Sequence, residues 1–193
     1  VIDQMRAEGI GVLEFAISQK HRDSVVTKLL AKRSTLAAHV FDKLRFRITV
    51  NSREDALNAL LYLSRHLFPF NYVMPEQSQN GIITFDDIAH TLGLSPEVLR
   101  AYWNYFGNGH TGQDPNPPNE FSGLTYRCIN FVADIPLRID DVAPESTPSI
   151  AFVLTEIQLQ DAQTALVNNQ GENAHARYKK RQVSRVKKRL EGG

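Results

Sequence analysis

Acidic and amide side chains alternate with apolar ones in the C-terminal third of the sequence. In the run IAFVLTEIQL (150–159), Glu156 and Gln158 share one face of a predicted strand. Asp42 comes just before a second alternating run, LRFRITV (44–50). If the two strands are neighbours, Asp42 and Glu156 converge, and two such carboxylates can hold Mg²⁺ against nucleotide phosphates. The alternative is that Glu156 and Gln158 line an exposed sheet face.

A group of cationic side chains precedes the first of these strands. Transfer of a phosphoryl group from a triphosphate needs cations that neutralise the phosphate oxygens, although a solvated helix face would show the same pattern. The glycine-rich patterns GxxxxGK[ST] and GxGxxG are missing from the sequence, so side chains would have to hold a nucleotide. The cations are Lys20, Arg22, Lys28, Lys32 and Arg33.

Other catalytic chemistries find little support in the sequence. The six histidines show no HExxH pattern, which argues against a zinc enzyme. The single cysteine, Cys128, excludes an internal disulfide framework and a cysteine-based zinc site. His175, in the run AHARYK (174–179), stands out, but a packed or surface histidine on a helix would look the same.

The elements that must position these groups follow from the periodicity of apolar residues. Residues 12–38 are predicted to be helical, in two stretches, and residues 44–50 to form a half-buried strand. Ser52 is a good N-cap for a helix that runs to about residue 67. Residues 84–106 predict two helices joined at a Leu-Gly-Leu turn.

The second half of the sequence predicts two further strands and a polar helical end. A loop at 107–122 precedes strands at 124–135 and 150–159. Residues 161–190 predict helix, interrupted at 168–171. The order of elements predicts an α+β (mixed α/β) fold, with a central mixed β-sheet flanked by helices and a helical hairpin insert at about 75–118.

Composition and charge fit an ordinary globular protein. The chain has 193 residues with a net charge of +1 and 42% hydrophobic residues, which excludes global disorder, collagen and coiled coil. Residues 176–193 carry eight Lys or Arg and one Glu, and such a basic tail suits a polyanion or a solvated helix end. No apolar run approaches the about 20 residues of a membrane span, and no signal peptide is visible. We therefore expect a reduced cytoplasmic protein without a membrane partner.

Five segments, in order and at similar intervals, resemble the synthetase domain of RelA/SpoT homologues, which has a nucleotidyltransferase-like fold. The resemblance covers roughly residues 18–180 without the insert, so that residues 1–180 would form this domain and 181–193 a basic C-terminal helix or tail. The segments are SVVTKL (24–29), DKLRFRI (42–48), SGLTYRC (122–128), TEIQLQD (155–161) and AHARYK (174–179).

The resemblance implies a bacterial enzyme of the stringent response that makes (p)ppGpp. Such enzymes move pyrophosphate from ATP to the 3′-hydroxyl of GDP or GTP with Mg²⁺ and release AMP; some relatives modify adenine nucleotides or tRNA ends. By position, Asp42 and Glu156 would be catalytic and hold Mg²⁺. The oligomeric state stays open. The nucleotide-binding residues implied by position are Lys20, Ser24, Lys28, Arg47, Tyr126, Gln158 and His175.

The sequence departs from the family pattern at several positions of the implied site. Tyr126 lies close to the position of a missing guanine-stacking tyrosine. An alternative is therefore a catalytically degenerate domain that binds a nucleotide as a regulator. The departures are Ser18 for Arg, Arg45 for Gly, Leu124 for the stacking Tyr, Cys128 for His and Gln160 for Arg.

Residues 87–103 suggest a rival function from another class. The segment DIAHTLGLSPEVLRAYW resembles a helix-turn-helix, with Gly93 at the turn. Its second helix carries only Glu97 and Arg100 as charged residues, whereas contact with DNA phosphates needs clustered Lys and Arg. A helical hairpin beside the active site is therefore favoured over DNA binding.

Overall fold

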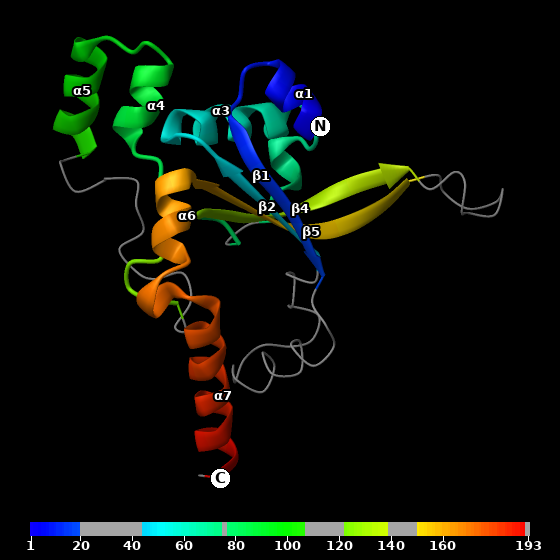
Figure 1. The fold of residues 1–193 in the computed structure, drawn as a ribbon. Helices are drawn as coiled ribbons and strands as arrows, with labels where there is room; N and C mark the ends of the chain where they lie inside the picture. Colours follow the sequence, from blue (N-terminus) through cyan, green and yellow to red (C-terminus); the bar gives the residue numbers. More distant parts are fainter. Residues whose placement is uncertain (20–43, 75–76, 107–121, 139–149, 192–193) are drawn as a thin grey trace.

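A five-stranded mixed sheet forms the centre of the molecule (Figure 1). The computed structural model describes residues 1–19, 44–74, 77–106, 122–138 and 150–191. The strand order is β1-β2-β5-β4-β3; β2 and β5 run parallel, and the other neighbours run antiparallel. This sheet and its flanking helices confirm the predicted α+β class. The strands are β1 (Val12–Gln19), β2 (Leu44–Val50), β3 (Gln79–Asn80), β4 (Ile129–Arg138) and β5 (Ile150–Asp161).

Helices pack on the sheet and extend from it. The helix α3 contacts β2 and β5, α4 contacts α3, and α6 contacts β2 and β5. The last helix, α7, projects away from the sheet (Figure 1). No helix in the described part of the chain combines the length and apolarity needed to cross a membrane. The helices are α1 (Ile2–Ala7), α3 (Arg53–His66), α4 (Phe85–Thr91), α5 (Pro96–Phe106), α6 (Ala162–Asn168) and α7 (His175–Glu191), with single turns η2 (Phe70–Tyr72) and η3 (Gly171–Asn173).

The hydrophobic core lies between α3 and one face of the sheet. Strand alternation sends Ile48 of β2 and Ile157 and Leu159 of β5 to this face, where each is at most 2% exposed. Leu63 of α3 belongs to the same cluster. Burial of each such side chain contributes about 1.5–3 kcal/mol. The opposite face of the same strands is thereby left for polar residues.

The start of α3 is fixed by a side-chain cap, as the sequence predicts. Ser52 accepts a hydrogen bond from the Asp55 backbone N–H at 3.0 Å. The Asp55 carboxylate in turn accepts one from the Gly11 N–H at 3.0 Å, which ties α3 to the entry of β1. A Cβ on Gly11 would lie 2.2 Å from the Asn51 side-chain nitrogen. A side chain at position 11 would therefore have to displace the exposed Asn51 side chain.

The segment 12–19 corrects a sequence prediction. We predicted a helix there, but Val12–Gln19 is an edge strand that pairs antiparallel with β2. The run VLEFAISQ is short and apolar enough to fit either element, and pairing with β2 satisfies its backbone. Phe15 packs on Phe46 of β2, with ring centroids 5.6 Å apart. The rest of that predicted helix lies outside the described residues, as does nearly all of the predicted loop at 107–122.

The remaining predicted elements are observed with shifted ends. The helix after Ser52, the pair at 84–106 and the strand at 150–159 are confirmed. The strand predicted at 124–135 starts later and runs over Ile129–Arg138. The break predicted at 168–171 separates α6 from η3 and α7. The single helix α7 spans the boundary that we predicted near residue 180.

Candidate functional site

One face of the sheet carries polar side chains across three adjacent strands. The strand register pairs Arg45 with Glu156 and Arg47 with Gln158, and Gln158 also pairs with Asn130 of β4. Paired residues on neighbouring strands point to the same side of a sheet. We call this surface the polar face. It is formed by Arg45, Arg47 and Thr49 of β2, Glu156, Gln158 and Gln160 of β5, and Asn130 of β4.

The closest charged contact on the polar face joins Arg45 to Glu156. The Arg45 Nε donates to the Glu156 Oε2 at 2.6 Å. The Glu156 side chain is only 7% exposed, and that of Arg45 is 25% exposed. A buried carboxylate needs such a partner because removal from water disfavours its charge. The alternative that Glu156 and Gln158 line an exposed face is wrong, since both are buried.

Hydrogen bonds extend this pair along the polar face. The Gln158 Nε2 donates to the Glu156 Oε1 at 3.2 Å. The Arg47 guanidinium approaches the Gln158 Oε1 with two nitrogens, at 3.3 and 3.4 Å. Both Glu156 oxygens therefore accept a hydrogen bond, and Gln158 is oriented by charged groups on either side. Two guanidiniums and one carboxylate leave this row with a net positive charge, which suits an anionic ligand.

Two polar groups just before β4 interact with this row. Burial is the main cause that raises the pKa of Tyr126 well above its ordinary value, and neighbouring Cys128 adds to the effect. Burial likewise raises the pKa of the Cys128 thiol to about 11, and the Glu156 charge adds to the shift. Arg45 and Arg47 oppose both shifts. At neutral pH Tyr126 and Cys128 are therefore protonated groups beside the polar face.

The Asn130 side chain contributes a buried acceptor. Among the described residues, no donor reaches the Asn130 Oδ1, although this atom is shielded from solvent. Buried polar atoms in native proteins are nearly always paired, so an unpaired one asks for an explanation. Because Asn130 pairs in register with Gln158, this acceptor lies on the same face as the charged row.

Asn168, the last residue of α6, links the polar face to the segment that precedes β4. Its Oδ1 accepts from the Arg127 N–H at 3.1 Å, and its Nδ2 donates to the Arg127 carbonyl at 2.6 Å and to the Gln160 Oε1 at 3.1 Å. Gln160 donates onward to the Thr49 Oγ1 at 3.2 Å. This network joins α6, the start of β4 and both central strands. Gln160, which replaces an Arg of the resembled family pattern, links α6 to β2 through these hydrogen bonds.

Only one of the two predicted magnesium ligands, Glu156, lies among the described residues. Asp134 of β4 lies on the same face of the sheet, diagonal to Glu156. No group of three or more His, Cys, Asp or Glu that could hold a metal occurs among the described residues. Asp42, the expected second ligand, lies outside them. The Mg²⁺ assignment therefore stays a prediction that depends on Asp42.

The predicted site residues divide into two groups. The structure brings together Arg47, Tyr126, Glu156 and Gln158, and it places His175 as the first residue of α7. The sequence reasoning treated Arg45 only as a departure from the family pattern, although its alternation with Arg47 could have shown that it contributes to the same face. It missed Asn130 and Asn168 as members or supports of the site. The predicted site residues Lys20, Ser24, Lys28 and Asp42 lie outside the described part of the chain.

The helix pair that suggested DNA binding is present. A capping box between Thr84 and Asp87 starts α4, and Gly93 makes the turn with φ +62°. Glu97 and Arg100, the two charged residues of α5, pair with each other at 3.3 Å. The second helix thus presents no cluster of cations to phosphates, and the DNA-binding hypothesis gains no support from it.

Comparison with known proteins identifies the fold. The small alarmone synthetase 1 of Bacillus subtilis, in a structure with its product pppGpp, is similar with a TM-score of 0.54 and 13% identity, over 99% of this chain and 78% of that one. The small alarmone synthetase 2 of the same organism matches with a TM-score of 0.46 and 16% identity, over 98% and 85%. A GTP pyrophosphokinase family protein of Streptococcus pneumoniae matches with a TM-score of 0.49 and 12% identity, over 98% and 76%.

The likeness to the first of these structures bears on the fold alone. No model of a known protein family matches the sequence, and neither does any curated protein. At 13% identity, the similarity to the first synthetase shows that the chain has a small alarmone synthetase-like fold. The fold that the sequence resemblance implied is thereby confirmed. The chemistry must be argued from the polar face.

Proposed function

We propose that this chain is a pyrophosphotransferase that moves pyrophosphate from ATP to the 3′-hydroxyl of a nucleotide acceptor. The observation that carries the proposal is the buried Glu156 carboxylate, held between Arg45 and Gln158 on the polar face. The synthetase-like fold and the order of the sequence motifs support it. Such a function would belong in the cytoplasm of a bacterium.

The reaction uses the groups of the polar face in distinct roles. The acceptor 3′-oxygen attacks the β-phosphorus of ATP. The bond from that phosphorus to the oxygen shared with the α-phosphate breaks, and AMP leaves with the electron pair. The Glu156 carboxylate takes the hydroxyl proton, because a positioned base lowers the barrier to attack. The guanidiniums of Arg45 and Arg47 stabilise negative charge on the phosphate oxygens.

Residues outside the described part would complete the ATP site. Asp42 and Glu156 would hold Mg²⁺, which would neutralise phosphate charge when bound. Each Glu156 oxygen accepts one hydrogen bond, from Arg45 or from Gln158, and keeps a second lone pair that could bind the ion. We expect Lys20, Ser24, Lys28 and His175 to contact ATP or line the site. The acceptor would lie toward β4, where Tyr126 and the Asn130 Oδ1 offer a ring and an unpaired acceptor.

The proposal does not specify which class of nucleotide accepts the pyrophosphate. Leu124, at the position of the stacking tyrosine, is 81% exposed and offers no aromatic ring. Stacking on an aromatic ring contributes about 1–3 kcal/mol per base, so guanine selection would have to rest on Tyr126. GDP, GTP, an adenine nucleotide and a tRNA end therefore remain candidate acceptors.

Release of AMP tests the proposal directly. The purified chain is incubated with Mg²⁺ and ATP plus GDP, GTP, ADP or tRNA in separate reactions, and AMP is measured. We expect acceptor-dependent AMP with at least one acceptor, and its loss in Glu156→Gln. The matched control is Glu97→Gln, the same change on the exposed surface of α5, which should leave the rate unchanged. AMP release that survives Glu156→Gln would refute the assignment of the carboxylate.

A second candidate function is nucleotide binding without turnover. The ion pair of Arg45 with Glu156 favours it, because the guanidinium occupies the carboxylate oxygen that would otherwise contact the acceptor hydroxyl or the metal. In that case ATP binds, no acceptor yields AMP, and Arg45→Gly, which introduces the family residue, creates acceptor-dependent AMP release. If Arg45→Gly instead abolishes an existing activity, Arg45 serves the phosphates and the degenerate function is wrong.

A further inference from the structure

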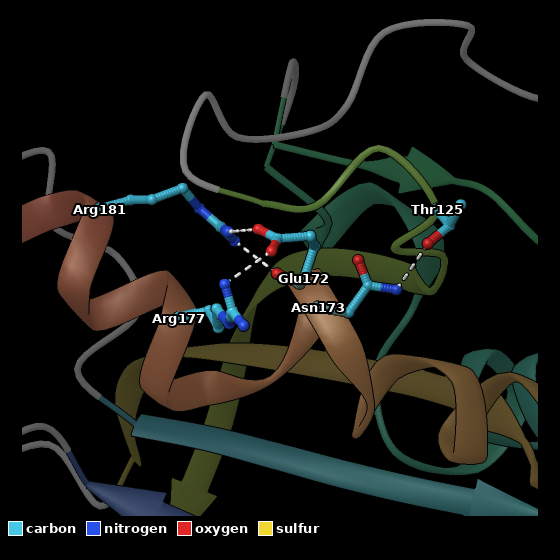
Figure 2. A network of polar contacts seen from close by, with 5 residues as sticks. All are labelled: Thr125, Glu172, Asn173, Arg177 and Arg181. Atoms are coloured by element: carbon cyan, nitrogen blue, oxygen red, sulfur yellow. Dashed lines mark hydrogen bonds and ion pairs between the residues drawn. The ribbon is translucent and has the colours of Figure 1, made fainter.

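The helix α7 combines a dense positive charge with hydrogen bonds to the preceding turn at one end. Its seventeen residues, His175–Glu191, include eight Lys or Arg and one Glu. Glu172 in η3 accepts from Arg177 Nη1 and Arg181 Nη1, each at 2.9 Å, and the Glu172 carbonyl accepts from Arg181 Nη2 at 2.7 Å (Figure 2). The first two turns of the helix are thereby fixed on η3.

The turn that anchors α7 is itself attached to the body of the protein. Asn173 donates to the Thr125 Oγ1 at 2.9 Å (Figure 2) and to the Val167 carbonyl at 3.3 Å. Gly123 packs so closely that a Cβ there would lie 2.0 Å from the Asn173 Oδ1. The helix therefore projects as a continuation of the folded domain, with its far end directed away from the sheet (Figure 1).

A stripe that is apolar except for Lys179 runs along α7. Positions 176, 179, 183, 186 and 190 recur at intervals of three and four, which places them on one helix face. Val183 is 46% exposed and Leu190 is 70% exposed, and Val186 lies between them. We call this set the α7 seam; it consists of Ala176, Lys179, Val183, Val186 and Leu190. Its spacing is that of the a and d positions of a coiled coil.

Cationic side chains border the α7 seam. Lys180 and Lys187 occupy the positions next to it on one side, which correspond to e positions of a heptad, and Gln182 and Arg189 border the other side. In a pair of helices, the charges at these positions select the partner. A second copy of α7 would set like charges against each other. An acidic helix would pair with the same side chains.

We propose that the α7 seam docks an acidic amphipathic helix of a partner protein. Aliphatic seam residues of the partner would cover Val183, Val186 and Leu190, and its Glu or Asp side chains would pair with Lys180 and Lys187. Nucleic acid matches the cations but gives the aliphatic stripe nothing to pack on. A membrane-surface helix usually carries bulky Trp, Phe or Leu residues, whereas the seam is mainly Ala and Val. The proposal does not depend on the catalytic function.

A designed peptide pair tests this proposal on the full chain. One labelled peptide has three heptads with Leu at a and d and Glu at e and g; its match has Lys at e and g. Fluorescence anisotropy measures Kd for each. We expect the Glu peptide to bind and the Lys peptide to bind about tenfold more weakly or not at all. Equal binding of the two peptides would overturn the proposal.

Charge reversal and seam variants make the test specific. Lys180→Glu/Lys187→Glu should reverse the preference toward the Lys peptide, while Lys188→Glu, on the opposite side of the helix, should retain it. Val183→Ser/Leu190→Ser should weaken the Glu peptide about tenfold. Circular dichroism confirms that each variant is folded.

Tighter binding to nucleic acid or to a membrane surface would contradict the proposal. Duplex RNA and vesicles of anionic phospholipid are measured beside the peptides. If either binds more tightly than the Glu peptide and is unaffected by Val183→Ser/Leu190→Ser, the helix is a polyanion or membrane surface. A dimer of the chain in light scattering that the Val183→Ser/Leu190→Ser variant abolishes would assign the seam to a second copy.

Discussion

Replacing Arg45 with Met should leave the buried Glu156 carboxylate without its closest partner. Removal of one member of a fully buried ion pair costs about 3–5 kcal/mol, and exposed pairs contribute less than about 1 kcal/mol. Glu156 is 7% exposed and Arg45 is 25% exposed, so this pair lies nearer the buried limit. Gln158 remains as a donor to the carboxylate. We therefore expect a loss of about 2–3 kcal/mol in the free energy of unfolding.

A double-mutant cycle isolates the contribution of the pair. Glu156→Gln keeps the shape of the side chain and should cost about 1 kcal/mol. The double variant should be more stable than the sum of the single effects predicts, with a coupling of about 2 kcal/mol. Urea unfolding followed by circular dichroism measures each value; with a slope of about 2 kcal/mol/M, Arg45→Met lowers the midpoint by about 1 M or more.

An exposed pair in the same chain is the control for this cycle. Arg100 and Glu97 on α5 approach to 3.3 Å, but their side chains are 73% and 72% exposed. The same substitutions, Arg100→Met and Glu97→Gln, should show no measurable coupling, because solvent screens the charges. Effects of Arg45→Met and Glu156→Gln that add within about 0.5 kcal/mol would refute the contact between the two side chains.

Three further predictions concern groups that support the site. Gly123→Ala should destabilise the protein by about 1–3 kcal/mol because its Cβ would lie 2.0 Å from the Asn173 Oδ1; an equal cost in an Asn173→Ala background would contradict this cause. The contribution of Cys128 to the free energy of unfolding should fall by about 2 kcal/mol as the pH rises from 9 to 11. Burial raises the pKa of Cys128 from 9.0 to about 11, so the folded thiol keeps a proton that the unfolded one has lost. Cys128→Ala should flatten that decline in pH-dependent urea titrations, whereas an unchanged slope would assign it to other groups. Asn168→Ala should cost about 2–3 kcal/mol in urea unfolding, because it leaves Gln160 and a backbone pair without partners; a loss below about 0.5 kcal/mol would show that water replaces them.

Local periodicity was sufficient to predict most of the elements. The alternation in β2 and β5 and the capped apolar face of α3 are properties of single segments, and these elements were predicted correctly. The segment 12–19 was not, because its apolar run fits helix or strand until β2 is available as a partner. Whether such a segment becomes an edge strand depends on its pairing with another strand, and the sequence of the segment alone does not reveal that pairing.

Only those features of the site that follow from alternation within a single strand could be predicted from the sequence. Alternation identified Glu156 and Gln158 as residues of one face. Their burial and their contacts with Arg45 and Arg47 depend on the parallel register of β2 with β5, which joins residues 111 positions apart. Asn168 escaped notice for the same reason, since its partners at Arg127 and Gln160 come together only when α6 folds back on the sheet.

Arg45 is the residue on which the two candidate functions diverge. The resembled family has glycine there, so this chain adds a guanidinium to the polar face beside Glu156. Its contact with Glu156 holds the carboxylate in one orientation. A triphosphate carries more negative charge than one carboxylate and competes for the same guanidinium. Departure of Arg45 toward the phosphates would free Glu156 at the moment when a base is needed. An Arg45 that stays on Glu156 would leave a nucleotide bound but unreacted. The mobility of this one side chain therefore separates an enzyme from a binding domain, with the rest of the polar face unchanged.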